Sequence, residues 1–404
     1  MSHRSIMALA LVVTGALAAT AVNTPAAFAE EETQAPSVAV GATQDPQAWS
    51  SEAQSGDGPQ SGATDEAGDP NPAAVPESTD DTPATIIVAL EDGSVGIPWY
   101  RRIFGLSSQT KHETVKDRIE TSVEQAVPGA DVTDVADYTH AFDGFAIRAP
   151  AATLEAIKNT EGVKAAFIER HLKPLVVDDD NAASEVGAVN PGLKNASSLE
   201  MTRANQSTQK GDKQVIEVID TGIEATHQAF SGSMEGVPVR LTQRDVESLV
   251  GKLSHGKSGA YLSSKIPFVF DYADNDANVL PTSTKDLSHG THVASIAAAN
   301  APDLQGTAPN AQIIVAKVAA DKDGAIPDST VLAALDDAVI IKPDSINLSL
   351  GDDAGMGTEA GTVYAEVYKN LAAAGVTVNA AAGNTYSSAY DNKSRKNQPY
   401  ASDP

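Results

Sequence analysis

The chain has 404 residues, of which 54 are acidic and 28 basic, giving a formal net charge of −26. This length allows two or three domains, and such acidity argues against a nucleic-acid partner because Lys and Arg must neutralise phosphate there. The absence of cysteine excludes disulfides, thiol proteases and thiolate metal sites, so an exported form would depend on its core, its size or bound ions.

The first 29 residues have the pattern of a secretory signal peptide. Arg4 provides a positive start, an apolar run covers residues 6–19, and residues 27–29 fit a small-residue cleavage site. A membrane anchor is the alternative, but the apolar run is too short for a comfortable span. We therefore expect residues 1–29 to be removed. The mature protein would then be secreted, extracellular or cell-wall associated, with no membrane span.

Residues 30–83 contain twelve acidic residues and no Lys or Arg, together with many Pro, Gly and Ser residues. Bulky apolar groups are rare here, so the segment cannot offset the entropy that it would lose on ordering. We expect an acidic disordered linker, and a functional acidic arm is the alternative.

A β-α-β-β-α-β pattern is expected over residues 84–172. Val115, Ile119 and Val123 recur every four residues, as they would on one face of a helix. The expected strands are 84–90, 130–138, 142–150 and 162–170, and the expected helices are 108–126 and 151–160. This order fits a small α+β ferredoxin-like domain. A polar, exposed linker over residues 173–195 is expected to follow it.

Residues 196–404 alternate apolar strands with helices, which predicts an α/β fold with a parallel sheet and helices on both faces. The expected strands are 213–220, 311–320, 344–351 and 376–384, and the expected helices are 289–300, 328–341 and 360–375. Ligands bind at the carboxyl ends of strands in such sheets. Asp220, residues 349–351 and residues 383–384 all lie at these ends.

The sequence Asp220-Thr221-Gly222 follows an apolar strand and allows three interpretations. It could hold one carboxylate of an aspartic protease, the orienting Asp of a serine protease, or a tight turn without chemistry. An aspartic protease needs a second carboxylate. No second Asp-Thr-Gly or Asp-Ser-Gly occurs in the chain, so the first interpretation is disfavoured.

Four segments together resemble the subtilisin-like serine proteases. They are similar to the family's Asp, His, substrate-strand and oxyanion segments, in that order: VIEVIDTGIEATH (215–227), HGTHVA (289–294), NLSLG (347–351) and AAAGN (380–384). One departure is Ser295, where the family usually has Gly. Residues 268–279 and 397–404 are more specifically similar to the large cell-envelope proteinases of this family.

The resemblance implies an Asp-His-Ser peptidase that acts on protein or peptide substrates. Asp220 would orient the imidazole of His289, His289 would act as general base, and Asn384 would donate its side-chain amide to the oxyanion. The backbone of the strand formed by Ser349, Leu350 and Gly351 would pair with substrate as an added strand.

The same resemblance implies a processing scheme. Residues 84–172 would be an inhibitory propeptide that also assists folding, and cleavage would occur within residues 173–195. Residues 196–404 would then be the N-terminal part of the catalytic domain.

No required cofactor is implied, and calcium is allowed as a structural ion. Asp271, Asp274 and Asp276 could bind calcium through hard oxygens, or they could form an exposed acidic loop. His289 and His292 are spaced like metal ligands, but no His-Glu-x-x-His motif accompanies them. We expect His292 to be a buried structural residue.

No Gly-Thr-Ser-Met-Ala segment, which holds the family's nucleophilic serine, occurs in the 404 residues. We therefore expect an N-terminal fragment of a longer, exported serine endopeptidase precursor. The alternative is a non-catalytic truncated product whose propeptide-like domain binds and inhibits proteases.

Overall fold

The computed structural model describes residues 82–91, 108–174, 199–200, 202–281, 288–352 and 356–381. The expected signal peptide, the acidic segment as far as residue 81, most of the expected linker at 173–195, and Asn384 lie outside the described residues. Among the described helices, none combines the length and the apolarity needed to cross a bilayer.

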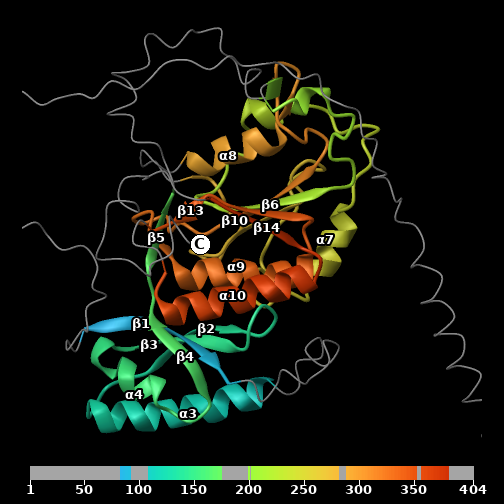
Figure 1. Cartoon of the computed structure of the whole chain (residues 1–404). Helices are drawn as coiled ribbons and strands as arrows, with labels where there is room; N and C mark the ends of the chain where they lie inside the picture. Colours follow the sequence, from blue (N-terminus) through green and yellow to red (C-terminus); the bar gives the residue numbers. More distant parts are fainter. Residues whose placement is uncertain are drawn as a thin grey trace, which may run out of the picture. The chain divides into compact units, whose positions relative to one another are not determined.

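The first sheet is antiparallel, with the strand order β2-β3-β1-β4. Its strands are β1 (Pro83–Leu90), β2 (Thr133–Tyr138), β3 (Gly144–Pro150) and β4 (Val163–Ile168). The helix α3 (Ser108–Ala126) follows β1, and α4 (Leu154–Lys158) follows β3. The observed order is therefore β-α-β-β-α-β, and Figure 1 shows both helices on one face of the sheet. We call residues 83–168 the N-terminal subdomain.

The four-residue period of α3 predicts its buried face correctly. Val115, Ile119 and Val123 are buried and pack in one cluster with Ile86 and Val88 of β1. Each buried aliphatic side chain contributes about 1.5–3 kcal/mol relative to exposure. This cluster therefore joins α3 to the sheet.

The second sheet has five strands, all paired in parallel, in the order β14-β12-β6-β10-β7. They are β6 (Val215–Asp220), β7 (Phe268–Asp271), β10 (Gln312–Lys317), β12 (Ser345–Leu348) and β14 (Thr377–Ala380). Figure 1 shows α8 (His289–Ala298) on one face, with α9 (Asp328–Ile341) and α10 (Thr358–Ala373) on the other. The predicted parallel sheet with helices on both faces is confirmed.

A short strand that the sequence did not predict, β5 (His171–Pro174), lies between two others. It pairs antiparallel with β11 (Ile326–Pro327) and with β13 (Leu350–Gly351). Since only two residues separate the end of β4 from the start of β5, one continuous stretch of chain connects the N-terminal subdomain to the edge strands beside the parallel sheet.

The remaining elements are short and lie in the connections. They are η1 (Ala151–Thr153), η2 (Ala204–Gln206), η3 (Gln228–Phe230), α7 (Gln243–Val250), β8 (Asn300–Ala301) and β9 (Leu304–Gln305).

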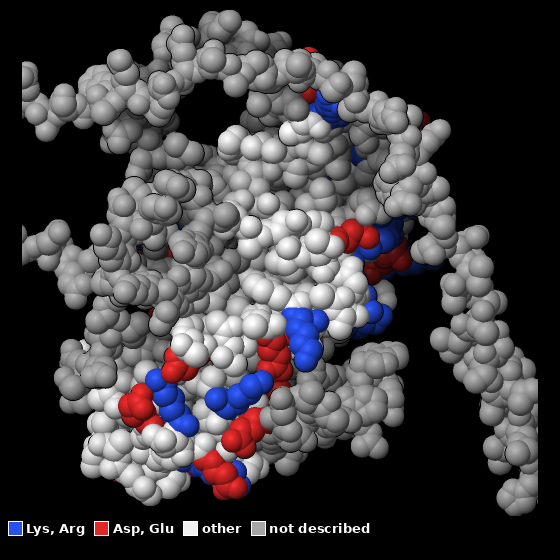
Figure 2. All heavy atoms as spheres, in the orientation of Figure 1, with Lys and Arg blue, Asp and Glu red and all other residues white. Residues whose placement is uncertain are grey.

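Charged side chains of both signs lie close together on the face shown in Figure 2. Two ion pairs connect the N-terminal subdomain with α10: Lys164 to Glu366 at 2.8 Å and Lys158 to Glu359 at 3.6 Å. Exposed pairs of this kind contribute at most about 1 kcal/mol each. The contact between the subdomain and α10 must therefore depend mainly on buried groups.

Candidate active site

Asp220 is the last residue of β6, at the carboxyl end of a central strand of the parallel sheet. It is only 1% exposed. The backbone N–H of Thr221 donates to Asp220 Oδ1 at 2.7 Å, which helps to compensate the buried carboxylate for lost water. The same turn also binds the start of α8, because the backbone N–H of Gly290 donates to Thr221 Oγ1 at 3.1 Å.

His289 is the first residue of α8, and its imidazole meets Asp220 directly. Nδ1 lies 2.9 Å from Oδ1 and 3.1 Å from Oδ2 of Asp220. A carboxylate at Nδ1 fixes the tautomer with the proton on that nitrogen, so Nε2 is left as the atom that can accept a proton. Two residues that are 69 positions apart thus form a buried carboxylate–imidazole pair, the geometry expected of the orienting acid and the base.

Gly290 allows α8 to approach the strand end this closely. A Cβ at Gly290 would lie 2.2 Å from the carbonyl oxygen of Gly222 and 3.1 Å from both Cβ and Oδ1 of Asp220. Gly222 itself has φ of +101°, a backbone conformation that favours glycine. The short distance between Asp220 and His289 therefore requires glycine on both sides of the contact.

Replacing Gly290 by alanine is expected to push α8 away from Asp220 and to lower the peptide hydrolysis that the family resemblance implies by about a hundredfold, the typical effect of a misplacement near 1 Å. The measurement is kcat/KM of the protein expressed from its complete gene. Gly361→Ala is the matched control, because a Cβ there meets no atom within 4 Å. Equal activity of the two variants would show that the Gly290 contact does not position His289.

The predicted substrate strand is already paired in this structure. Leu350 lies opposite Pro174, and Gly351 lies opposite Lys173. Leu350 is fully buried, and Ser349, which precedes the strand, is partly buried. A segment of the chain's own N-terminal half therefore occupies the edge to which a substrate strand was assigned. Asn384, the expected oxyanion donor, lies outside the described residues.

The acidic cluster considered for calcium contains a buried lysine that the sequence analysis missed. Lys317 at the end of β10 is 1% exposed, and its Nζ lies 2.6 Å from Asp271 Oδ2 and 4.0 Å from Asp274 Oδ2. It also pairs with Asp321. Burial lowers the pKa of Lys317, but its bonds to Asp271 and Asp321 raise it above the ordinary value. Lys317 therefore supplies the positive charge that a calcium ion would supply.

Two groups of described residues have donor atoms close enough for one metal ion: Asp271, Asp274 and Asp321, and His255, Asp336 and Asp337. In the second group, the oxygens of Asp336 and Asp337 accept hydrogen bonds from backbone N–H groups of the 139–141 and 254–256 segments. We therefore regard it as structural. Neither group contains Asp276, His289 or His292. His292 is exposed, so its expected burial was wrong.

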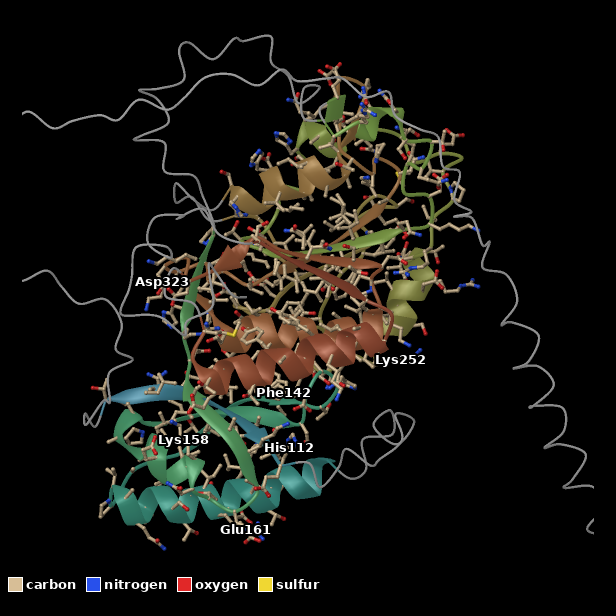
Figure 3. All side chains as sticks on the ribbon, viewed as in Figure 1. His112, Phe142, Lys158, Glu161, Lys252 and Asp323 are labelled. Atoms are coloured by element: carbon tan, nitrogen blue, oxygen red, sulfur yellow. The ribbon has the colours of Figure 1, made fainter. Side chains whose placement is uncertain are left out.

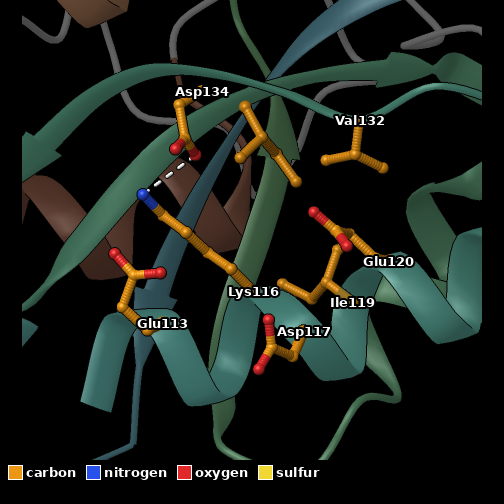
Figure 4. Close-up of a pocket in the computed structure, with 8 residues that line it drawn as sticks. Glu113, Lys116, Asp117, Ile119, Glu120, Val132 and Asp134 are labelled. Carbon is orange, nitrogen blue, oxygen red and sulfur yellow. Dashed lines mark ion pairs between the residues drawn. The ribbon is translucent and has the colours of Figure 1, made fainter. Parts of the chain in front are cut away.

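A shallow groove on the N-terminal subdomain is shown in Figure 4. It is lined along α3 by Glu113, Lys116, Asp117 and Glu120. Lys116 pairs with Asp134 at 2.9 Å across it. The groove includes neither Asp220 nor His289, so it is separate from the candidate active site.

Comparison with known proteins agrees with this geometry. The family model Peptidase_S8, the subtilase family, matches residues 211–402. The chain is 31% identical over 256 residues to the PI-type proteinase of Lactococcus lactis subsp. cremoris, which covers 61% of this chain and 12% of that proteinase. It is 28% identical over 281 residues to subtilisin-like protease SBT4.6 of Arabidopsis thaliana, covering 65% of this chain and 35% of the plant protein.

A third relative is the C5a peptidase of Streptococcus pyogenes serotype M3, which is 29% identical over 153 residues, covering 36% of this chain and 12% of the peptidase. The chain thus spans about an eighth of the length of the bacterial relatives named here. The matched region contains both Asp220 and His289. Residues 211–402 of this chain therefore form a subtilase domain of the Peptidase S8 family.

Proposed function

We propose that the protein is the precursor of an exported subtilisin-like serine endopeptidase that hydrolyses peptide bonds by an Asp-His-Ser mechanism. The observation that carries this proposal is the hydrogen bonding of His289 Nδ1 to the buried carboxylate of Asp220. No Gly-Thr-Ser-Met-Ala segment occurs in the 404 residues. The proposal therefore requires a serine from outside them.

In the proposed reaction, His289 Nε2 takes the proton from the serine Oγ as Oγ bonds to the scissile carbonyl carbon. The carbonyl becomes an oxyanion, to which Asn384 would donate its side-chain amide. When the tetrahedral intermediate collapses, the C–N bond breaks and Nε2 gives its proton to the leaving amine. Water then releases the acyl group by the same route. Asp220 holds Nδ1–H throughout and stabilises the imidazolium.

The activity is tested with the protein expressed from its complete gene, by hydrolysis of a fluorogenic peptide. A serine-directed phosphonate should label the protein and stop hydrolysis, and pepstatin should not. Absence of both labelling and hydrolysis in correctly folded protein would overturn the peptidase proposal. It would favour the non-catalytic, protease-binding alternative, which the missing serine segment also supports.

The N-terminal subdomain is proposed to inhibit this site as an intramolecular propeptide. Its continuation, β5, fills the position between β11 and β13 as a third antiparallel strand. Leu172 of β5 is 3% exposed and belongs to the same apolar cluster as Leu350 and Ile326. A substrate strand could not pair with β13 while β5 remains there.

A buried ion pair also supports the position of the N-terminal subdomain against the subtilase domain. Arg170, between β4 and β5, binds Asp328 at the start of α9 in a bidentate manner, at 2.8 and 3.0 Å. Asp328 is fully buried and also accepts the hydroxyl proton of Tyr364 at 2.7 Å. Paired guanidinium and carboxylate groups of this geometry are strong and directional.

Leu172→Asp is expected to release β5 and to shorten the lag before peptidase activity appears in freshly folded protein. Moving a leucine out of the core costs about 1.5–3 kcal/mol, so inhibition should weaken about tenfold or more. His171→Asp introduces the same charge at the neighbouring exposed position and should keep the lag. Equal lags in the two variants would argue against β5 as the inhibitory strand.

The protein is also proposed to act outside the cytoplasm, either secreted or attached to the cell wall. The signal-like residues 1–29 and the similarity to the lactococcal proteinases support this location. N-terminal sequencing of the exported protein tests it, and a mature protein that retains residues 1–29 would contradict it.

A further inference from the structure

Asp336 on α9 binds the loop between β2 and β3, residues 139–143, which we call the docking loop. The backbone N–H groups of Thr139, His140 and Ala141 donate to Asp336 Oδ1 at 3.2, 2.7 and 2.7 Å. Asp336 has no solvent exposure, and a buried carboxylate is stable only where such donors replace water. One carboxylate thus binds the N-terminal subdomain to the subtilase domain.

Two histidines face the other oxygen of this carboxylate. His140 Nδ1 lies 3.1 Å from Asp336 Oδ2, and His255 Nε2 lies 3.7 Å from the same atom, within ion-pair distance but beyond a hydrogen bond. Their side chains are 13% and 15% exposed. His140 belongs to the docking loop and His255 to the subtilase domain. Each side of the contact therefore contributes one imidazole to a single carboxylate.

The docking loop has further contacts that hold it in place. Ala141 O accepts a hydrogen bond from Asn370 of α10 at 2.7 Å. Phe142, labelled beside α10 in Figure 3, is buried and stacks on Tyr138 with ring centroids 4.8 Å apart. Tyr138 also packs against His255, at 5.7 Å. The histidines therefore sit within a packed contact and are not free surface groups.

The other described ionisable groups that act on this cluster are acidic or phenolic. Asp337 of α9 acts on both histidines, and Asp137 of β2 acts on His255. Tyr138 of β2 packs against His255, and Tyr272 after β7 donates to Asp337. The acidic groups favour a positive charge on the histidines. The two imidazoles repel each other when both are charged, which limits but does not cancel this preference.

We propose that pH controls the docking of the N-terminal subdomain, because His140 and His255 share the carboxylate of Asp336 and hold the docking loop most tightly when they are protonated. The consequence for enzyme activity rests on the proposed function: inhibition by the propeptide would weaken as pH rises. The contact itself, and its dependence on pH, do not require that the protein be a peptidase.

The direction in which docking changes with pH follows from the environment of the two imidazole rings. Burial lowers the pKa of His140 and of His255, but the nearby carboxylate of Asp336 raises both above the ordinary 6.5. A group whose pKa is raised by folding stabilises the folded contact fully below its unfolded pKa, and this contribution is lost as pH rises through the folded pKa. Docking should therefore be strongest below pH 6.5 and should weaken above it.

Only one end of the docked subdomain is expected to respond to pH. Arg170 stays charged at any working pH, so its pair with Asp328 anchors the other end throughout. His112 bridges Asp137 and Asp143 at 3.0 and 2.7 Å, and its pKa is also raised because these two bonds outweigh burial. His112, labelled in Figure 3, lies within the N-terminal subdomain, and its partner Asp143 is the last residue of the docking loop. Its titration therefore changes a bond within the subdomain and none between the subdomain and the subtilase domain.

The test is hydrogen exchange of the whole chain between pH 5.5 and 8.5, corrected for the intrinsic rate at each pH. The amides of residues 139–141 should lose protection as pH rises from 6.5 through the raised pKa values of the two histidines, by at most about tenfold per pH unit for each histidine within that window and with no further loss above it. The amide of Ile314 in β10 serves as an internal reference. This strand pairs with Glu217, whose pKa burial and Asp337 raise to about 8, so general loosening of the core would appear there.

The double variant His140→Gln and His255→Gln should show low and pH-independent protection of the docking loop. His292→Gln, an exposed change of the same kind on α8, should keep the wild-type profile. A flat profile in the wild type, which needs no variant to fold, or an unchanged profile in the double variant would overturn the proposal. Correct docking behaviour without any peptidase activity would overturn only the proposed function.

Discussion

Replacing His289 by alanine is expected to lower kcat/KM for peptide hydrolysis by about 10⁴- to 10⁶-fold in the protein expressed from its complete gene. The physical reason is that a serine hydroxyl is a weak nucleophile without a base. The measurement is steady-state hydrolysis of a fluorogenic peptide, together with the appearance of the form that lacks the N-terminal subdomain.

His292→Ala is the matched control for this variant, because His292 lies on the same helix and is exposed. It should keep activity and self-processing. The double variant Asp220→Asn with His289→Ala should be no worse than His289→Ala alone, since residues that act as a unit are not additive. Self-processing that persists in His289→Ala would show that the Asp220–His289 pair is not the catalytic pair.

The resemblance of two segments, 215–227 and 289–294, to the Asp and His segments of subtilisin-like proteases predicted Asp220 and His289 as partners. Parallel strands bring their carboxyl ends to one edge of the sheet, and ligand sites collect there. The pattern could not give the contact distance, which depends on the close approach of Gly290 to Gly222. The expected family role thus identified the residues, and the structure added the reason for their geometry.

The strand β5 was beyond prediction from sequence. Its four residues are too few for an alternation pattern to be recognised, and they were assigned partly to a linker. They form a strand only because β11 and β13 offer unpaired edges on both sides. The burial of Leu172 likewise depends on residues more than 150 positions away.

The paired acids of α9 show a second limit of sequence patterns. Asp336 and Asp337 are adjacent acidic residues in the expected helix 328–341, and both are fully buried. Their hydrogen-bond donors come from two distant segments, residues 139–141 and 254–256. Adjacent carboxylates that each bind a separate loop have no local signature, because the compensation for burial is entirely tertiary.

Replacing Lys317 by alanine is expected to destabilise the subtilase domain by about 3–5 kcal/mol, the usual effect of removing one partner of a buried ion pair. Asp271 has no solvent exposure and would lose its counter-charge, and Asp321 would lose its partner as well. A domain of this size should then melt roughly 10 °C lower. Differential scanning calorimetry of the whole chain measures the change.

Calcium should restore part of this stability in the Lys317→Ala variant alone. Without the ammonium group, Asp271, Asp274 and Asp321 would leave carboxylate oxygens within 4.8 Å of one another, and oxygen ligands of this kind suit a hard divalent cation. Lys322→Ala removes the same charge from a neighbouring exposed position and should change neither the melting temperature nor its response to calcium. If millimolar calcium raises the melting temperature of wild type and Lys317→Ala equally, then Lys317 does not occupy the place of a cation, and the ion binds elsewhere.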